Sequence, residues 1–366
     1  MVSSSAYVTN YDGNNVSVID IASNAVSTTI AVGTNPQAVA ITPNGNYAYV
    51  ANYGSNNVSV IDTASNTVIA TISVGTNPYG IAITPTGDYA YVANYGSNNV
   101  SVIDIASNVV TTTISIGTNA YDLVVSPNGD YVYVTTGSKS VAVIDTANNT
   151  VITNISVGGW TNPKGIVVTP NGNYLYVADY GLHQVSVIST ISKAVSTTIP
   201  TESSTNAVAI TPNGNYVYAV NYPSKSVAVI DTANNTVIAN VPVGDWPSGI
   251  AITLNGKYAY VTNFSSNSVS VIDTVNNTVS TTILVGTAPY GIAIMPSIYF
   301  SITAFYGTSE SSFSVVSNLS LFSGKFSLSN ESIPFVGTTQ FSSIWTSVVD
   351  MLGQVLRGLG FPVTYF

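Results

Sequence analysis

Short runs in which apolar residues alternate with polar ones recur along the first 296 residues of the chain. One period, residues 80–114, contains the runs GIAI, YAYVAN, VSVID and VVTTTI. Clusters of Gly, Asn, Pro and Asp separate these runs, as is typical of turns between β-strands. Each period is therefore predicted to form a four-stranded antiparallel sheet, and the fold class is predicted to be all-β.

The period itself indicates the architecture. The tyrosine of the YxYV-type run returns every 42 residues, with a single step of 43, at Tyr7, Tyr49, Tyr91, Tyr133, Tyr176, Tyr218 and Tyr260. Four strands in about 40 residues are typical of one blade of a β-propeller, a fold of roughly four to eight blades. Seven returns of the tyrosine predict a seven-bladed β-propeller.

The two ends of the repeat region predict how the ring closes. The chain enters the repeat at the second strand of a blade, residues 6–10, and the last repeat ends in a lone first strand, residues 291–294. Three N-terminal strands and one C-terminal strand would then share the seventh blade. Such three-plus-one closure removes the exposed strand edges that an open array would present to other molecules.

The tyrosine runs also carry a family resemblance. The sequence reads YVTN at residues 7–10 and 260–263, and YVAN at residues 49–52 and 91–94. Over residues 1–296 the chain therefore resembles the YVTN β-propeller repeat family. Repeats of this family are known chiefly from archaeal surface-layer and other cell-surface proteins, so the resemblance implies an exposed location.

The repeat stops at residue 296, and residues 297–366 are expected to be a separate attachment or assembly segment. Its first part alternates apolar and polar residues, which predicts a few more strands. Residues 341–357 instead have apolar residues three and four positions apart, which predicts an amphipathic helix with a stripe of Ile344, Trp345, Val348, Leu352 and Leu356. This stripe would dock on a partner or sister subunit, on the segment's own strands, or at a membrane surface.

Composition excludes several classes of function. Charged residues make up 6% of the chain, and seven Lys and Arg stand against sixteen Asp and Glu, a net charge of −9. Without a basic patch the chain is not expected to bind nucleic acid. The absence of cysteine excludes disulfides and thiolate chemistry. The N-terminus enters the first repeat at once, and no signal peptide is visible in it.

No catalytic, cofactor-binding or metal-binding motif stands out. The single histidine, His183, lies in a loop between strands beside Gly181 and Gln184, and a lone exposed histidine is usually inert; no HExxH motif or Ser-His-Asp set occurs. The aspartate that ends the VSVID run recurs in six of seven periods, but Asp62 and Asn66 read as a hairpin turn in which the carboxylate accepts backbone N–H groups. The chain is therefore predicted not to be an enzyme and to need no cofactor.

One end of the predicted ring is rich in aromatic residues. In a meander, the loops from second to third strand and the loops between blades emerge on the same face, and the remaining turns are predicted to carry mainly Asn, Gly, Thr and Asp. Aromatic side chains combine apolar area with hydrogen-bonding tips and suit recognition of glycans or proteins. The alternative is that the rings only wedge between blades. The candidate binding face comprises Tyr11, Tyr53, Tyr95, Tyr180, Tyr222, Phe264, Tyr79, Tyr121, Trp160, Trp246 and Tyr290.

Two functional hypotheses follow. In the first, the chain is a recognition or adhesion protein on a particle or cell surface, whose aromatic face binds glycans or surface proteins while residues 297–366 join a larger assembly. An archaeal virus attachment protein fits the absence of a visible secretion signal. In the second, the propeller is a structural unit of a cell envelope, such as a surface layer.

Overall fold

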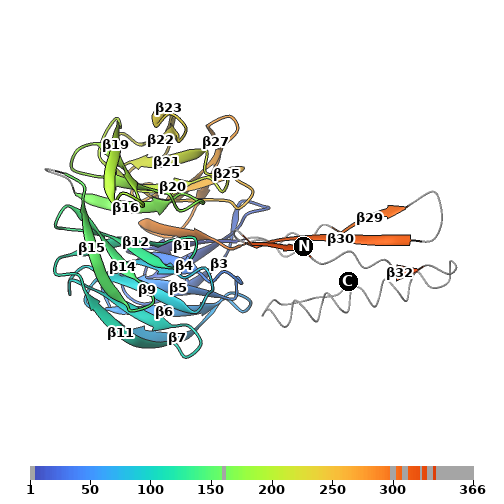
Figure 1. Ribbon diagram of the computed structural model, residues 1–366, viewed down its shortest axis with the longest axis horizontal. Helices are drawn as coiled ribbons and strands as arrows, with labels where there is room; N and C mark the ends of the chain where they lie inside the picture. Colours follow the sequence, from blue (N-terminus) through green and yellow to red (C-terminus); the bar gives the residue numbers. More distant parts are fainter. Residues whose placement is uncertain are drawn as a thin grey trace. The chain divides into compact units, whose positions relative to one another are not determined.

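A computed structural model describes residues 5–158 and 162–296, together with strands at 302–306, 312–321, 324–327 and 333–334. Two compact units divide the chain, Met1–Pro296 and Ser297–Phe366. The first unit consists of seven four-stranded antiparallel sheets, each with its strands in meander order (Figure 1). The described part of this unit contains no helix, which confirms the all-β prediction.

The strands of each sheet are assigned to blades I to VII, from the innermost strand to the outermost. Blade I contains β28(Pro289–Ile294), β1(Ser5–Asn10), β2(Asn15–Asp20) and β3(Ala25–Ala31). Blade II contains β4(Pro36–Ile41), β5(Tyr47–Asn52), β6(Asn57–Asp62) and β7(Thr67–Ser73). Blade III contains β8(Pro78–Ile83), β9(Tyr89–Asn94), β10(Asn99–Asp104) and β11(Val109–Ser115). Blade IV contains β12(Ala120–Val125), β13(Tyr131–Thr136), β14(Ser140–Asp145) and β15(Thr150–Ser156).

The remaining three blades follow the same plan. Blade V contains β16(Pro163–Val168), β17(Tyr174–Asp179), β18(Gln184–Ser189) and β19(Ala194–Pro200). Blade VI contains β20(Thr205–Ile210), β21(Tyr216–Asn221), β22(Ser226–Asp231) and β23(Thr236–Pro242). Blade VII contains β24(Pro247–Ile252), β25(Tyr258–Asn263), β26(Ser268–Asp273) and β27(Thr278–Leu284).

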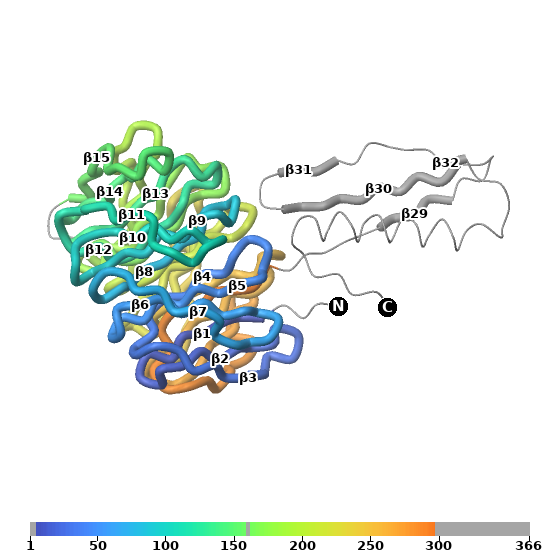
Figure 2. The backbone as a smooth tube through the Cα atoms, turned by 90° about the horizontal axis from the view of Figure 1, so that it is seen from below, coloured from blue at the N-terminus to red at the C-terminus, as the bar shows by residue number. Residues whose placement is uncertain are grey.

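Blade I closes the ring as the sequence predicts. Strand β28 pairs antiparallel with β1, and Ala6, Tyr7 and Val8 face Ile294, Ala293 and Ile292 across the ladder. The first and last parts of the propeller therefore lie side by side, blue against orange in Figure 2. Innermost strands of successive blades also contact one another around the whole ring, from β4 through β28 and back to β4. These contacts confirm a seven-bladed propeller with three-plus-one closure.

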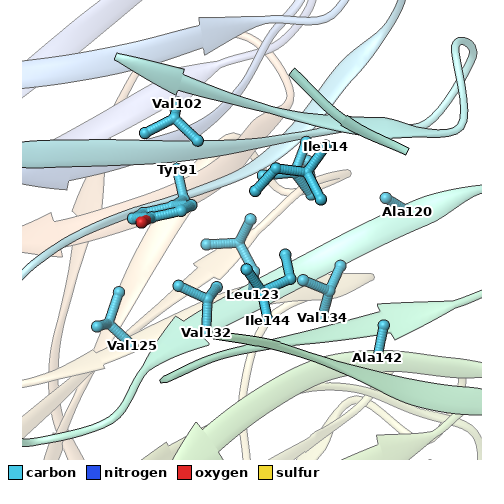
Figure 3. Close-up of a cluster of buried hydrophobic side chains, with 12 residues drawn as sticks. Tyr91, Val102, Ile114, Ala120, Leu123, Val125, Val132, Val134, Ala142 and Ile144 are labelled. Carbon is cyan, nitrogen blue, oxygen red and sulfur yellow. The ribbon is translucent and has the colours of Figure 1, made fainter. Parts of the chain in front are cut away.

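Apolar side chains between neighbouring blades form the core. Between blades III and IV, Tyr91, Val102 and Ile114 pack against Val132, Val134 and Ile144 (Figure 3). Most of these side chains are fully buried, and an apolar side chain of this size contributes about 1.5–3 kcal/mol when buried. Because both faces of a blade pack on a neighbour, its second and third strands are almost uniformly buried.

The recurring tyrosine links each blade to the next. Tyr49 is fully buried, and its hydroxyl donates to Asn108 Oδ1 at 2.7 Å, in the turn between the third and fourth strands of the following blade. Burial raises the pKa of such a phenol, for example that of Tyr7 to about 12. Equivalent bonds join Tyr7 to Asn66, Tyr91 to Asn149, Tyr176 to Asn235, Tyr218 to Asn277 and Tyr260 to Asn24.

Blade V breaks this series. Lys193 occupies its turn position in place of Asn, and Ser189 replaces the preceding aspartate. Within the described residues, no hydrogen bond joins Tyr133 of blade IV to this turn. Six of the seven junctions between blades therefore have the tyrosine bond, which we call the clasp, and the junction between blades IV and V lacks it.

The repeated aspartates have the structural role expected from the sequence. Asp62 Oδ1 accepts the backbone N–H of Ser65 at 2.8 Å and its hydroxyl at 2.7 Å. These bonds lower the pKa of the Asp62 carboxyl. Asn66, at the end of the turn, has a φ of 54°, a conformation that Asn tolerates better than most residues. The turn interpretation is confirmed.

The second unit contains β29(Ile302–Tyr306), β30(Ser312–Leu321), β31(Gly324–Ser327) and β32(Ile333–Pro334). Strand β30 pairs antiparallel with β29, β31 and β32. The predicted helix at residues 341–357, with its stripe of Ile344, Trp345, Val348, Leu352 and Leu356, lies outside the described residues.

Candidate functional site

The second residue of each innermost strand lies at the same level around the central axis. These residues, which we call the mouth layer, are Gln37, Tyr79, Tyr121, Lys164, Asn206, Ser248 and Tyr290. Each innermost strand begins at the end of the ring that carries the loops between blades, so the mouth layer lies close to that end.

Hydrogen bonds connect the mouth layer across the axis. The hydroxyls of Tyr79 in blade III and Tyr290 in blade I are 2.7 Å apart, and Tyr290 also bonds to the amides of Gln37 and Asn206. Asn206 Nδ2 in addition donates to the Ser248 carbonyl at 3.0 Å. Residues from five blades thus meet in one network, and burial raises the pKa values of Tyr79 and Tyr290. Both phenols stay neutral at physiological pH.

Lys164 brings a cation into this neutral layer. Its Nζ lies 4.0 Å from the ring centre of Tyr121 and 5.3 Å from that of Tyr79, a cation–π arrangement. Within the described part of the chain no carboxylate lies within ion-pair distance of it, since the one ion pair there is Lys225–Asp245. Loss of solvation on burial lowers the pKa of Lys164 to about 8.

Asp122 adds a carboxyl group beside the mouth layer. The third residue of the innermost strand is Ala or Gly in the other six blades, and in blade IV it is Asp122. Its Oδ1 accepts the N–H of Leu123 at 2.9 Å. Burial raises the pKa of Asp122 to about 6, although hydrogen bonds from Leu123 and Ile166 act in the opposite direction. A shifted acid and a shifted base on neighbouring strands are characteristic of functional sites.

Thr135 holds the backbones of these two residues together. Its hydroxyl accepts the Asp122 N–H at 3.0 Å and donates to the Lys164 carbonyl at 2.7 Å, so one side chain joins β12 to β16. Thr262 joins β24 to β28 in the same way, donating to the Tyr290 carbonyl at 2.6 Å. In blades I, IV and VII, the threonine at this position therefore joins neighbouring innermost strands at the level of the mouth layer.

Ten of the eleven aromatic residues predicted as a binding face form a connected cluster, which we call the aromatic belt. Its ring centres lie 5.1–6.5 Å from their neighbours, which suits edge-on and tilted packing. Three members also belong to the mouth layer. The belt comprises Tyr11, Tyr53, Tyr79, Tyr95, Tyr121, Tyr180, Tyr222, Trp246, Phe264 and Tyr290.

Backbone hydrogen bonds fix the loop members of the belt. The N–H of Tyr53, just after the second strand of blade II, donates at 3.0 Å to the carbonyl of Asn35, which directly precedes the first strand of that blade. The N–H of Tyr11, Tyr95, Tyr180, Tyr222 and Phe264 makes the corresponding bond. In blade IV, Gly137 has this position and contributes no ring. Trp160, the eleventh predicted residue, lies outside the described residues.

Trp246 differs from the rest of the belt. Its side chain is 48% exposed, although it stacks on Phe264 with ring centres 6.4 Å apart. Its φ is 54°, which is unfavourable for a bulky residue, and the equivalent residue Asn35 uses its amide to bond the Tyr11 carbonyl. Strain of this kind, held by the surrounding fold, is found at binding sites.

The turns at the opposite end of the blades carry mainly Asn, Gly, Thr and Asp, as the sequence predicts. The second strand of six blades nevertheless begins there with a tyrosine, and Tyr89 and Tyr174 are 40% and 42% exposed. No contact between these six rings is found, so they are separate side chains and form no belt. They are Tyr47, Tyr89, Tyr131, Tyr174, Tyr216 and Tyr258.

Lys164 and Asp122 were missed at the level of sequence. The signal lies in the alignment of the seven innermost strands, where Asp122 is the one charged residue at the third position and Lys164 the one at the second. No three His, Asp or Glu side chains form a metal-binding group in the described residues. His183 sits at a turn position with a φ of 54°, where other blades have Asn or Lys.

Comparison with known proteins agrees with the fold. The family model described as "YNCE-like beta-propeller" matches residues 1–297. No curated protein sequence matches the chain. In the described residues there is no helix with the length and apolar character needed to cross a membrane.

Solved structures with the same fold include proteins of different activities. Hydrazine synthase of Kuenenia stuttgartiensis is 27% identical, with a TM-score of 0.69 over 73% of this chain and 92% of that one. A protein of unknown function from Desulfotomaculum acetoxidans is 18% identical, with a TM-score of 0.72 over 80% and 99% of the two chains. The dihydro-heme d1 dehydrogenase NirN is 14% identical, with a TM-score of 0.63 over 79% and 74%. The fold therefore occurs in enzymes and does not decide the activity of this chain.

Proposed function

This chain belongs to the YNCE-like β-propeller family, and we propose that it is a non-enzymatic recognition protein whose aromatic belt binds glycans on another surface. The observation that carries the proposal is the belt itself, ten rings gathered at one end of the ring around a largely neutral mouth layer. Tyrosine and tryptophan rings stack on the apolar faces of sugars, while their hydroxyl and N–H groups bond to sugar hydroxyls.

Exposure of the belt supports binding over a purely structural role. Most of its rings are half-buried, and the exposed face of Trp246 remains available beside Phe264 and Tyr222. A ring that only wedged between blades would be fully buried, as Tyr49 and Tyr218 are. The belt thus offers a broad surface of partly exposed rings.

The test compares two sets of aromatic substitutions at opposite ends of the ring. Tyr53→Ser with Trp246→Ser is expected to weaken binding on a glycan array or to cells by about tenfold or more, because each lost stacking contact costs about 1 kcal/mol. Tyr89→Ser with Tyr174→Ser removes two exposed rings from the other end and should leave binding unchanged. Equal losses from both sets in folded proteins would refute the assignment of the belt.

We further propose that residues 297–366 attach the propeller to a larger assembly on a virion or cell surface. The support is the change of pattern after residue 296, where a ring that is already closed is followed by strands of a separate unit. A chain of residues 1–296 should fold as a monomer but no longer join the assembly, and Trp345→Asp with Leu352→Asp should have the same effect. Normal incorporation of both proteins would exclude this segment as the anchor.

The second candidate function is a structural unit of a cell envelope. The observation that favours it is the outer strands, which expose apolar side chains such as Ile69, Ile238 and Leu284 at 51%, 51% and 78%. A lattice would cover these side chains. Electron microscopy of the native particle or envelope distinguishes the two functions, because an adhesion protein projects from its support and a lattice subunit tiles it.

A further inference from the structure

Lys164 is placed unlike any other lysine of the propeller. Lys139, Lys193 and Lys225 occupy turn positions with positive φ, and Lys257 lies in the turn before β25. Lys164 alone lies on an innermost strand, with its ammonium group over two rings of the aromatic belt. The site proposed for glycans therefore contains one fixed positive charge.

This charge has little compensation from the protein. Cation–π contacts with Tyr121 and Tyr79 replace part of its hydration, and no carboxylate of the described chain pairs with it. Burial lowers the pKa of Lys164 to about 8, because loss of hydration disfavours the charged form. An anionic group from a ligand would restore the missing interaction, and a charge-assisted hydrogen bond is about twice as strong as a neutral one.

The other polar side chains of the mouth layer are uncharged and bonded within the protein. The amides of Gln37 and Asn206 bond to the Tyr290 hydroxyl, and the Ser248 hydroxyl donates to the Trp246 carbonyl at 3.2 Å, so a sugar would find its hydrogen-bonding partners chiefly among the phenols of the belt. In blade IV, next to the blade of Lys164, Gly137 takes the loop position and adds no ring to the belt.

We propose that the mouth layer binds a sugar that bears a carboxylate, with Lys164 pairing with the carboxylate and the belt rings stacking on the sugar. This inference rests on the proposed glycan-binding function and names its ligand class. A uronic acid at the end or in the middle of a chain has the required chemistry.

Asp122 is the charged group that opposes such a ligand. Of the groups that the seven innermost strands place at this level, only Asp122 and Lys164 titrate near neutrality. The phenols of Tyr79, Tyr121 and Tyr290 have raised pKa values. The side chains of Gln37, Asn206 and Ser248 are neutral. Protonation of Asp122 at pH 5 removes the repulsion while Lys164 stays charged. Binding of the acidic sugar should therefore be tighter at pH 5 than at pH 7.

The net charge of −9 weakens long-range attraction of any acidic glycan. At 0.15 M salt this repulsion is screened beyond about 8 Å, so the local pairing at Lys164 decides the affinity. The measurement is accordingly made at that ionic strength.

The experiment uses the full chain and a matched pair of probes in isothermal titration calorimetry. One probe is an α-1,4-linked trigalacturonate and the other its methyl ester, which keeps the rings and loses the charges. Wild type should bind the acid at least about tenfold more tightly than the ester, the value of one charge-assisted hydrogen bond. Lys164→Met should abolish this preference, Lys164→Arg should retain most of it, and Lys257→Met, a cation in a turn at the other end, should leave it intact.

The outcomes separate the two levels of the proposal. Equal affinity of wild type for acid and ester, or an unchanged preference in Lys164→Met, overturns the assignment of Lys164 while glycan binding stands. A sulfated galactan that binds as tightly as the uronate overturns the choice of a carboxylate. Failure of both trisaccharides, together with failure of a wide glycan array, overturns the glycan-binding function itself.

Discussion

Asp122 is expected to destabilise the propeller at neutral pH, and Asp122→Asn should relieve this cost. Folding raises the pKa of the carboxyl from 3.8 to about 6, a change of about two pH units. At about 1.4 kcal/mol per unit, the ionised form costs about 3 kcal/mol. Asparagine keeps an oxygen that can accept the N–H of Leu123 and carries no charge, so the free energy of unfolding at pH 7 should rise by up to that amount.

The effect has a defined dependence on pH. Because the folded protein holds this proton more tightly than the unfolded chain, the cost is absent below about pH 4, grows between pH 4 and 6, and is complete above pH 6. Lys164, whose folded pKa of about 8 is lowered, changes stability only between about pH 8 and its ordinary pKa of 10.5. The two groups therefore do not overlap in the acidic range.

Urea unfolding of wild type and Asp122→Asn at pH 4, 5, 6 and 7 measures this difference. The two proteins should differ least at pH 4, with the variant increasingly more stable toward pH 7. Asp88→Asn, in a turn at the other end of blade III, provides a control for loss of one negative charge. A difference between Asp122→Asn and wild type that does not change from pH 4 to 7 would refute the assigned cause.

Three further predictions concern the ring. Ser189→Asp with Lys193→Asn should supply the missing clasp to Tyr133 and raise the free energy of unfolding by about 1–2 kcal/mol, and an unchanged urea midpoint would count against it. Tyr49→Phe removes an existing clasp and should lower the free energy of unfolding by about 1–2 kcal/mol, measured in the same way, whereas no loss would show that the clasp is energetically neutral. A chain that ends at Ala288 lacks β28 and should melt at a lower temperature or aggregate through its open edge, and an unchanged melting curve with a monodisperse product would contradict the closure argument.

The fold was predictable because the same four-strand pattern occurs seven times in the sequence. A tyrosine every 42 residues, four apolar runs per period and the split seventh blade each correspond to observed strands. Most of the belt was predictable for the same reason, since a meander fixes which loops share an end. The tyrosines at the opposite end were not predicted to be exposed, because each is the first residue of a strand and not part of a turn. Tyr89 and Tyr174 are nevertheless substantially exposed.

The positions of Asp122 and Lys164 could not be predicted from the alternation of side chains along the strands. Alternation assigns side chains to two faces in turn, but the ladder between β12 and β13 shifts its register between Ala120 and Leu123. At a bulge an extra residue breaks the alternation and redirects side chains. Tyr121 and Asp122 both fall in this interval, and Lys164 occupies the corresponding shift between Pro163 and Ile166. Which way these side chains point depends on the geometry of the bulges, and one sequence alone does not predict that geometry.

The missing clasp between blades IV and V bears on how the propeller comes apart. A closed ring cannot release one blade by breaking a single junction, since the blade is still held on its other side. The ring should open first at the junction whose separation breaks the fewest interactions. The junction between blades IV and V lacks the tyrosine hydroxyl bond that each of the other six has in addition to its apolar contacts. Native-state hydrogen exchange should then find the lowest opening free energy in β13 to β19 and the highest on the far side of the ring. The order in which blades unfold would follow from one side chain in one turn, although the seven blades have nearly the same sequence.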